Sequence, residues 1–138
     1  VSMTLPSMQA NVSEMRKAID RNTMVLVASA PTYAHGIIDD VDQISYLALE
    51  FGLPCHVDSC LGSFMLPFVP NIPPYNFTLA GVTSMSMDTH KYGLAPKGSS
   101  VLLFRSPLLR QHMYSVFPNW TGGVYATAVL SGSRSGGP

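Results

Sequence analysis

The chain has 138 residues, enough for one ordinary domain, and its eight basic and eight acidic residues give a formal net charge of zero. Only 12% of the residues are charged and 46% are hydrophobic, so much of the chain is expected to be buried against itself or against another surface. These values exclude the basic footprint of a nucleic-acid-binding domain, no apolar run reaches the ~18 residues of a membrane span, and two cysteines are too few for a disulfide framework.

The first elements predicted are a helix and a buried strand. Asn11 and Glu14 have the spacing of a capping box, and apolar residues then recur at helical intervals, which predicts a helix that ends near Asn22. The apolar run 24–29 is rich in β-branched residues and is followed by Pro31. It therefore predicts a strand that is buried on both faces.

A second helix is predicted to begin after a cap at Asp39 or Asp40 and to stop at Gly52. Its apolar stripe has helical spacing and consists of Val41, Ile44, Leu47, Ala48 and Phe51. Another strand is predicted over 53–58. A strand, a helix and a strand within ~35 residues form a βαβ unit, so the two strands are expected to be parallel.

Ser29 and Asp58 end these two predicted strands. Ligands of such sheets bind beyond the carboxyl ends of the strands. We therefore expect both residues to border one crevice.

The second half of the chain begins with a proline-rich loop at 66–77. Strands are predicted over 79–87 and 99–104, and the short Gly/Pro-containing link between them favours an antiparallel return. A helix is predicted over 107–117, and the segment 122–134 is interpreted as a glycine turn that enters another helix.

The link between the last two strands carries two of the three lysines, Lys91 and Lys97. Between Glu50 and Arg105 the only other charged residues are Asp58 and Asp88. One interpretation is structural: Asp88 caps a turn, Lys97 is solvated and Lys91 pairs with Asp58. The other is chemical, because partial burial would lower the pKa of a lysine amine and free it to form a Schiff base with an aldehyde, most often that of pyridoxal phosphate.

Pyridoxal phosphate makes further demands on a protein. A carboxylate must keep its pyridine nitrogen protonated, and Asp58 fits that role. Amides and cations must hold its phosphate, and Thr89, His90 and Lys97 supply donors close to Lys91.

Three motifs in this order carry a family resemblance: "HVDSCLGSF", "DTHKYGLAPKGSS" and "WTGGVYATAVLSGSRSGG". Together they resemble the sphingosine-1-phosphate lyases, which are pyridoxal-phosphate enzymes of the fold-type I, group II decarboxylase-like superfamily. The resemblance implies an α/β fold, with a mostly parallel sheet flanked by helices and one antiparallel strand. It also implies that residues 1–138 are the central part of the large, cofactor-binding domain, with the N-terminal part and the small domain outside this fragment.

The resemblance also implies roles for individual residues. Lys91 would carry the cofactor as a Schiff base, Asp58 would pair with the pyridinium nitrogen, and His90 would assist at the phosphate. Lys97 would be a second active-site lysine, for the substrate phosphate or for proton transfer. Further cofactor contacts would come from Ser29, Ala30 and Thr89 and, towards a neighbouring subunit's phosphate, from Gly122 and Gly123.

The implied activity is carbon–carbon cleavage of a phosphorylated sphingoid base to a long-chain aldehyde and phosphoethanolamine, in a homodimer with the site at the subunit interface. A protein of this kind is expected at the endoplasmic reticulum membrane in a eukaryote and in the cytoplasm in a bacterium. An amino-acid decarboxylase of the same superfamily is the alternative enzyme. A non-catalytic fragment or structural domain is the other alternative, and the isolated 138 residues are expected to be inactive.

Some residues depart from the family pattern or invite other interpretations. The family usually has Ala at Ser59 and Gly at Ser63, and its Ser-Pro-Thr is replaced at 126–128, which weakens a phosphate role there. A metal site near residues 55–60 is disfavoured, because strand alternation points Cys55 away from the face that His56 and Asp58 share. Arg134, in a Gly/Ser-rich turn, is at most an anion contact.

Overall fold

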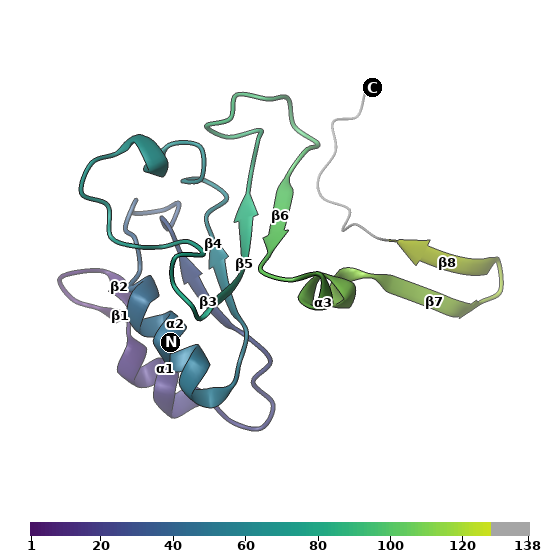
Figure 1. The fold of residues 1–138 in the computed structure, drawn as a ribbon, viewed down its shortest axis with the longest axis horizontal. Helices are drawn as coiled ribbons and strands as arrows, with labels where there is room; N and C mark the ends of the chain where they lie inside the picture. The colour runs from purple at the N-terminus through teal and green to yellow at the C-terminus, as the bar shows by residue number, and fades with distance from the viewer. Residues whose placement is uncertain (128–138) are drawn as a thin grey trace.

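A computed structural model describes residues 1–127. Its helices are α1 (Val12–Ala18), α2 (Val41–Phe51) and α3 (Pro107–Arg110), with 3₁₀ turns η1 (Leu66–Phe68) and η2 (Gln111–Met113). Its strands are β1 (Met3–Thr4), β2 (Gln9–Ala10), β3 (Leu26–Ser29), β4 (Cys55–Asp58), β5 (Val82–Met87), β6 (Val101–Phe104), β7 (Ser115–Trp120) and β8 (Gly123–Thr127). Figure 1 shows how they are arranged.

The central element is a four-stranded sheet in the order β3-β4-β5-β6. β3 and β4 are parallel, β4 and β5 are parallel, and β5 and β6 are antiparallel. The predicted βαβ unit and the antiparallel return are both confirmed. The sheet with its flanking helices is the predicted mixed α/β fold.

The helix α2 covers one face of this sheet. Asp40 caps it by accepting a hydrogen bond from the Gln43 amide, and Gly52 ends it in the left-handed conformation at φ 65°. Four of the five predicted stripe residues are buried, but Phe51 is 43% exposed, so its assignment to the stripe was wrong. The stripe packs against β3 and β4. The shared core includes Leu26, Ala28, Ile44, Leu47, Cys55 and Val57.

The first helix is shorter than predicted. Asn11 caps α1 by accepting from the Glu14 amide, but the Glu14 carboxylate accepts from Ser2 instead of closing the capping box. The helix ends at Ala18 rather than near Asn22, because Asp20 and Thr23 form a hydrogen-bonded turn of their own. This turn is what leads the chain into β3.

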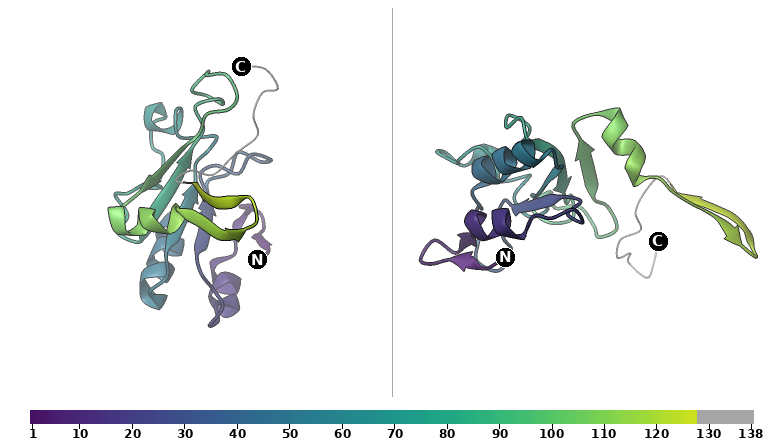
Figure 2. Two further views of the ribbon diagram at one scale, coloured as in Figure 1. Left: turned by 90° about the vertical axis from the view of Figure 1, so that its right-hand side faces the viewer. Right: turned by 90° about the horizontal axis from the view of Figure 1, so that it is seen from below.

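The C-terminal part of the described chain was predicted incorrectly. The helix α3 ends at Arg110, and the 3₁₀ turn η2 that follows it ends at Met113. Residues 115–127 form an antiparallel hairpin, β7–β8, rather than helices. The Gly123 residue at its turn has φ 117°, a conformation that favours glycine and permits the reversal. Figures 1 and 2 show this hairpin extending away from the sheet, and its side chains are almost all exposed. The remainder of the predicted helix lies outside the described residues.

Candidate functional site

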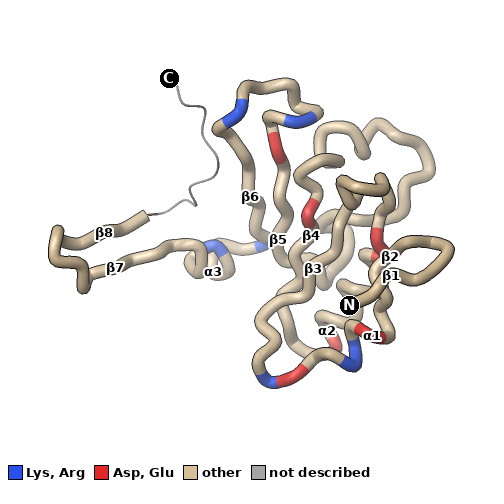
Figure 3. Tube along the Cα trace, turned by 180° about the vertical axis from the view of Figure 1, so that it is seen from behind, with Lys and Arg blue, Asp and Glu red and all other residues tan. Residues whose placement is uncertain are grey.

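The carboxyl ends of β4 and β5 carry the acidic and basic residues of the apolar middle of the chain. β4 ends at Asp58, and β5 is followed at once by Asp88 and, three residues later, by Lys91. Figure 3 shows the lysines of the β5–β6 loop and the acidic residues that end β4 and β5 at the same end of the sheet. Parallel neighbours in the sheet bring these groups together.

Asp58 lies on the sheet face opposite α2. Its Oδ1 atom accepts hydrogen bonds from the Cys60 amide at 3.1 Å and from the Ser86 hydroxyl at 2.8 Å. Burial opposes ionisation, but the hydrogen bonds from Cys60 and Ser86 outweigh it and hold the pKa of Asp58 below its usual value. Both of these hydrogen bonds are made to the same carboxylate oxygen, Oδ1.

Lys91 is partly buried and has two partners. Its Nζ atom lies 3.0 Å from the Asp88 carboxylate and 2.8 Å from the Cys60 Sγ atom. Burial lowers the pKa of this amine, but its contacts with Cys60 and Asp88 raise it by more, so the net pKa is raised. The prediction that the pKa of Lys91 is lowered overall was wrong, because these two contacts outweigh burial. The structural interpretation that paired Lys91 with Asp58 was also wrong, since Asp88 is the partner.

The lysine loop is closed by contacts with Ser99. The His90 Nδ1 atom donates to the Ser99 carbonyl at 2.8 Å, and Thr89 bonds the Ser99 hydroxyl and carbonyl. Gly93 allows the loop to fold tightly, because a Cβ atom there would lie 2.5 Å from the Thr89 carbonyl oxygen. These contacts fix the stretch that holds Lys91 against Cys60.

Ser29 and Ala30 lie beside Asp58 at the end of β3. Ser29 is the register partner of Asp58, and the Ala30 amide donates to the Asp58 carbonyl at 2.8 Å. The buried Asp39 carboxylate holds the Ser29 amide at 2.8 Å. Both predicted residues therefore border the same edge as the carboxylate.

The other predicted site residues do not pair with Asp58 or Lys91. Lys97 is in the same loop as Lys91, but it is exposed and has no hydrogen bond or ion pair with the residues that the structure describes. Gly122 and Gly123 are in the β7–β8 turn, which projects away from the sheet (Figure 1). Within one chain the structure does not bring these glycines to Asp58 and Lys91.

Three residues at this edge were absent from the predicted site: Cys60, Asp88 and Ser86. Cys60 was interpreted as a structural thiol, and Asp88 as a turn cap. The alternation of serine and methionine in β5 was a usable signal for Ser86, because it places Ser84 and Ser86 on the polar face that His56 and Asp58 share. Nothing in the sequence indicates that Lys91 reaches Cys60.

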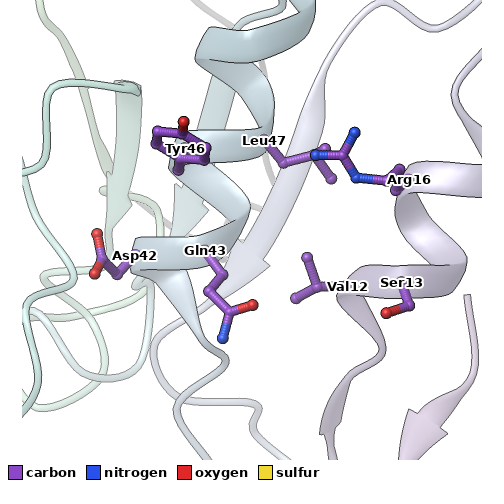
Figure 4. A pocket seen from close by; sticks show the side chains of 7 residues that line it. All are labelled: Val12, Ser13, Arg16, Asp42, Gln43, Tyr46 and Leu47. Atoms are coloured by element: carbon purple, nitrogen blue, oxygen red, sulfur yellow. The ribbon is translucent and has the colours of Figure 1, made fainter.

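Hollows are also found away from the candidate site. A cavity of about 430 Å³ lies between α1 and α2. Figure 4 shows the side chains that line it, which are Val12, Ser13, Arg16, Asp42, Gln43, Tyr46 and Leu47. A more apolar hollow of about 490 Å³ lies between the loop 63–78 and the other face of β5 and β6. Neither includes Asp58 or Lys91. The described residues contain no group of three or more His, Cys, Asp or Glu side chains placed to hold a metal ion.

The mixed sheet with a lysine loop before its antiparallel strand defines the class by its fold, which is that of part of an α/β domain of the fold-type I, decarboxylase-like enzymes. A Lactobacillus brevis glutamate decarboxylase matches 96% of this chain and 32% of its own at a TM-score of 0.76, and at 24% identity that match shows the fold alone. A Burkholderia pseudomallei sphingosine-1-phosphate lyase matches 97% of this chain and 32% of its own, with a TM-score of 0.83 and 45% identity.

Within that class the chain resembles the sphingosine-1-phosphate lyases, as its motifs predict. The Dictyostelium discoideum lyase is 50% identical over 135 residues, 95% of this chain and 26% of that protein. The Saccharomyces cerevisiae lyase is 50% identical over 133 residues, 93% of this chain and 23% of that protein. The chain thus spans about a quarter of the length of these curated relatives. No family model matches it.

Proposed function

We propose that this chain forms part of a pyridoxal-phosphate-dependent lyase that cleaves a phosphorylated sphingoid base to a long-chain aldehyde and phosphoethanolamine. The observation that carries the proposal is the arrangement of Lys91 and Asp58 around Cys60, which bonds both. It occurs in a chain that is 50% identical to sphingosine-1-phosphate lyases over most of its length.

The residues at this edge fit the cofactor. The ionised Asp58 carboxylate suits a protonated pyridine nitrogen, and Lys91 offers the amine that would hold the aldehyde. When bound, the cofactor would supply the electron sink for bond cleavage. Asp88 would hold the Lys91 ammonium in place, and the ammonium must lose its proton to solvent before the amine can react.

The other predicted residues are proposed in supporting roles. Thr89 and His90 would contribute to holding the phosphate, and Ser29 and Ala30 would border the ring. Lys97, exposed at the loop, is proposed to meet the substrate phosphate or to assist proton transfer. Gly122 and Gly123 are proposed to act in a homodimer, where the projecting hairpin would reach a second subunit's cofactor.

Relatives of this chain occur in eukaryotes such as Rattus norvegicus and in the bacterium Legionella pneumophila. Among the described residues, none of the helices has the length and apolar character needed to cross a bilayer. Location at the endoplasmic reticulum membrane in a eukaryote, or in the cytoplasm in a bacterium, remains our proposal.

Covalent trapping of the cofactor tests this function. The chain is mixed with pyridoxal phosphate, reduced with borohydride and digested, and the labelled lysine is identified by mass spectrometry. Because the chain has only three lysines, Lys17 and Lys97 are internal references. We expect the label on Lys91 and its loss in Lys91→Ala but not in Lys17→Ala. A folded sample that takes up no cofactor would instead support the fragment or structural-domain alternative.

The decarboxylase alternative is separated by products. The full-length protein is supplied with a phosphorylated sphingoid base and, in parallel, with amino acids. Aldehyde release from the sphingoid base supports the lyase, whereas carbon dioxide release from an amino acid contradicts it.

A further inference from the structure

The loop that follows Asp58 joins the carboxyl ends of three strands. The Ser59 hydroxyl donates to the Ala30 carbonyl beyond β3 at 2.9 Å. The Cys60 carbonyl accepts from the Asp88 amide beyond β5 at 3.2 Å. The end of β4 that carries the carboxylate is therefore anchored through its own loop to the strands on both sides.

Ser63 adds a side-chain link from this loop to β5. It is buried, and its amide donates to the Ser59 carbonyl at 3.0 Å, which closes a turn. Its hydroxyl donates to the Ser59 carbonyl and lies 3.2 Å from the Ser86 carbonyl oxygen. Because a hydroxyl has one proton, the two carbonyls share it, and the side chain bridges the loop and the strand.

Ser86 carries this link on to the carboxylate. Its carbonyl is in contact with Ser63, while its hydroxyl donates to the Asp58 carboxylate at 2.8 Å. Ser86 and Asp58 are register partners, so the position of the main chain at Ser86 decides how its hydroxyl meets the carboxylate. Restraint of the Ser86 carbonyl by Ser63 therefore restrains the donor as well.

We propose that Ser63 is a positioning residue that fixes the Asp58 carboxylate by holding Ser86. Functional groups are kept in their productive geometry by hydrogen bonds from residues that do not themselves touch the ligand. A second statement rests on the proposed function: the carboxylate held in this way is aligned for the pyridine nitrogen of the cofactor. The first statement concerns only the three residues and does not depend on that function.

Ser45 is a matched control for Ser63. It is also buried, and its hydroxyl donates to the Asp42 carbonyl at 3.0 Å inside α2, on the sheet face opposite Asp58. Loss of either serine hydroxyl removes a buried hydrogen bond to a backbone carbonyl. Only the loss at Ser63 is expected to reach the carboxylate.

The first test needs no cofactor. The pKa of the Asp58 carboxyl is measured by carbon-13 NMR in the unmodified chain, in Ser63→Ala and in Ser45→Ala. We expect Ser63→Ala to raise this pKa, because a less restrained Ser86 hydroxyl stabilises the ionised carboxylate less well. Ser45→Ala should leave it unchanged. The same Asp58 titration in the two alanine variants would overturn the proposal.

Ser63→Thr separates the hydroxyl from the bulk of the side chain. It keeps the donor, and Ser63 lines the hollow of about 490 Å³, which leaves room for an additional methyl group. His56, whose charge also acts on Asp58, is present in every variant. We expect the Asp58 pKa of Ser63→Thr to match that of the unmodified chain. A rise equal to that in Ser63→Ala would overturn the role of the hydroxyl.

The second test measures cofactor binding. Pyridoxal phosphate is titrated into the unmodified chain and the same variants, and the absorbance of the bound cofactor gives the dissociation constant. We expect Ser63→Ala to raise this constant about threefold and Ser45→Ala to leave it unchanged. Equal constants in the two alanine variants would overturn the role of Ser63 towards the cofactor and leave the proposed function standing. Absence of uptake by the unmodified chain would contradict the proposed function, while the Asp58 titration still decides the link to Ser63.

Discussion

The Ser86 hydroxyl on β5 donates a hydrogen bond of 2.8 Å to the Asp58 carboxylate on β4. The two residues are direct register partners, so the sheet itself aligns donor and acceptor. The bond favours the ionised carboxylate, which is the form required of a partner for a pyridinium ion.

Ser86→Ala should therefore raise the pKa of Asp58. Because the folded-state pKa of Asp58 is depressed, its ionisation stabilises the fold above the unfolded pKa, and this stabilisation is lost as pH falls through the folded pKa. The Ser86→Ala variant should lose part of this stabilisation. Carbon-13 NMR titration of the Asp58 carboxyl measures the change, with Ser84→Ala as the matched control on the same face. An unchanged Asp58 titration would contradict the assignment.

Asp39 is predicted to be the most sensitive acidic residue for stability. Its buried carboxylate accepts from the Ala10 and Ser29 amides, both at 2.8 Å, and thereby joins the β1–β2 hairpin to β3. Asp39→Ala should lower the free energy of unfolding by about 2–4 kcal/mol, because two amides lose a charged acceptor. The exposed Asp42 provides the control, and Asp42→Ala should cost below about 1 kcal/mol. Urea denaturation measures the free energy of unfolding of both variants. Similar losses in the two variants would contradict the role of Asp39 in joining the β1–β2 hairpin to β3.

Gly81 is predicted to be intolerant of any side chain. A Cβ atom there would lie 2.0 Å from the Ser45 carbonyl oxygen of α2, so Gly81→Ala should force the helix away from the sheet. We expect a loss of about 3 kcal/mol in the free energy of unfolding. Gly52→Ala is the comparison, because Gly52 has open space but a positive φ and should cost only about 1 kcal/mol. Equal losses in the free energy of unfolding from Gly81→Ala and Gly52→Ala would contradict a steric limit at the contact between Gly81 and Ser45.

The Asp88–Lys91 pair should restrain the reactivity of the lysine. The raised pKa of Lys91 means that its protonated form stabilises the fold at pH values below its unfolded pKa, and this is lost as pH rises through the folded pKa. Asp88→Asn should lower that pKa and accelerate reaction of Lys91 with trinitrobenzenesulfonate at mildly alkaline pH. Lys17 in the same sample is the internal reference. A Lys91 rate that stays unchanged relative to Lys17 would contradict the restraint.

The sequence predicts an element correctly where several local signals for it lie close together, as they do for the helix α2. The cap at Asp40, the glycine stop at Gly52 and the apolar stripe of α2 are consecutive in the chain, so the helix was predictable. The hairpin β7–β8 was not predictable from such local signals. Its pairing joins Ser115 to Thr127 across a turn, and a short apolar segment does not distinguish strand from helix by periodicity alone.

The sequence by itself determined the strand order of the βαβ unit, the antiparallel return, the resemblance to the lyases and the choice of Asp58 and Lys91 as site residues. Only the tertiary structure decided which groups meet. Asp58 contacts Ser86 and Lys91 contacts Cys60, because the neighbouring strands β4 and β5 bring together residues that are 28 and 31 positions apart. The Asp88–Lys91 pair is local, because the two residues are three positions apart. The balance of burial and contact that sets the pKa of Lys91 depends on those meetings, and no local pattern encodes it.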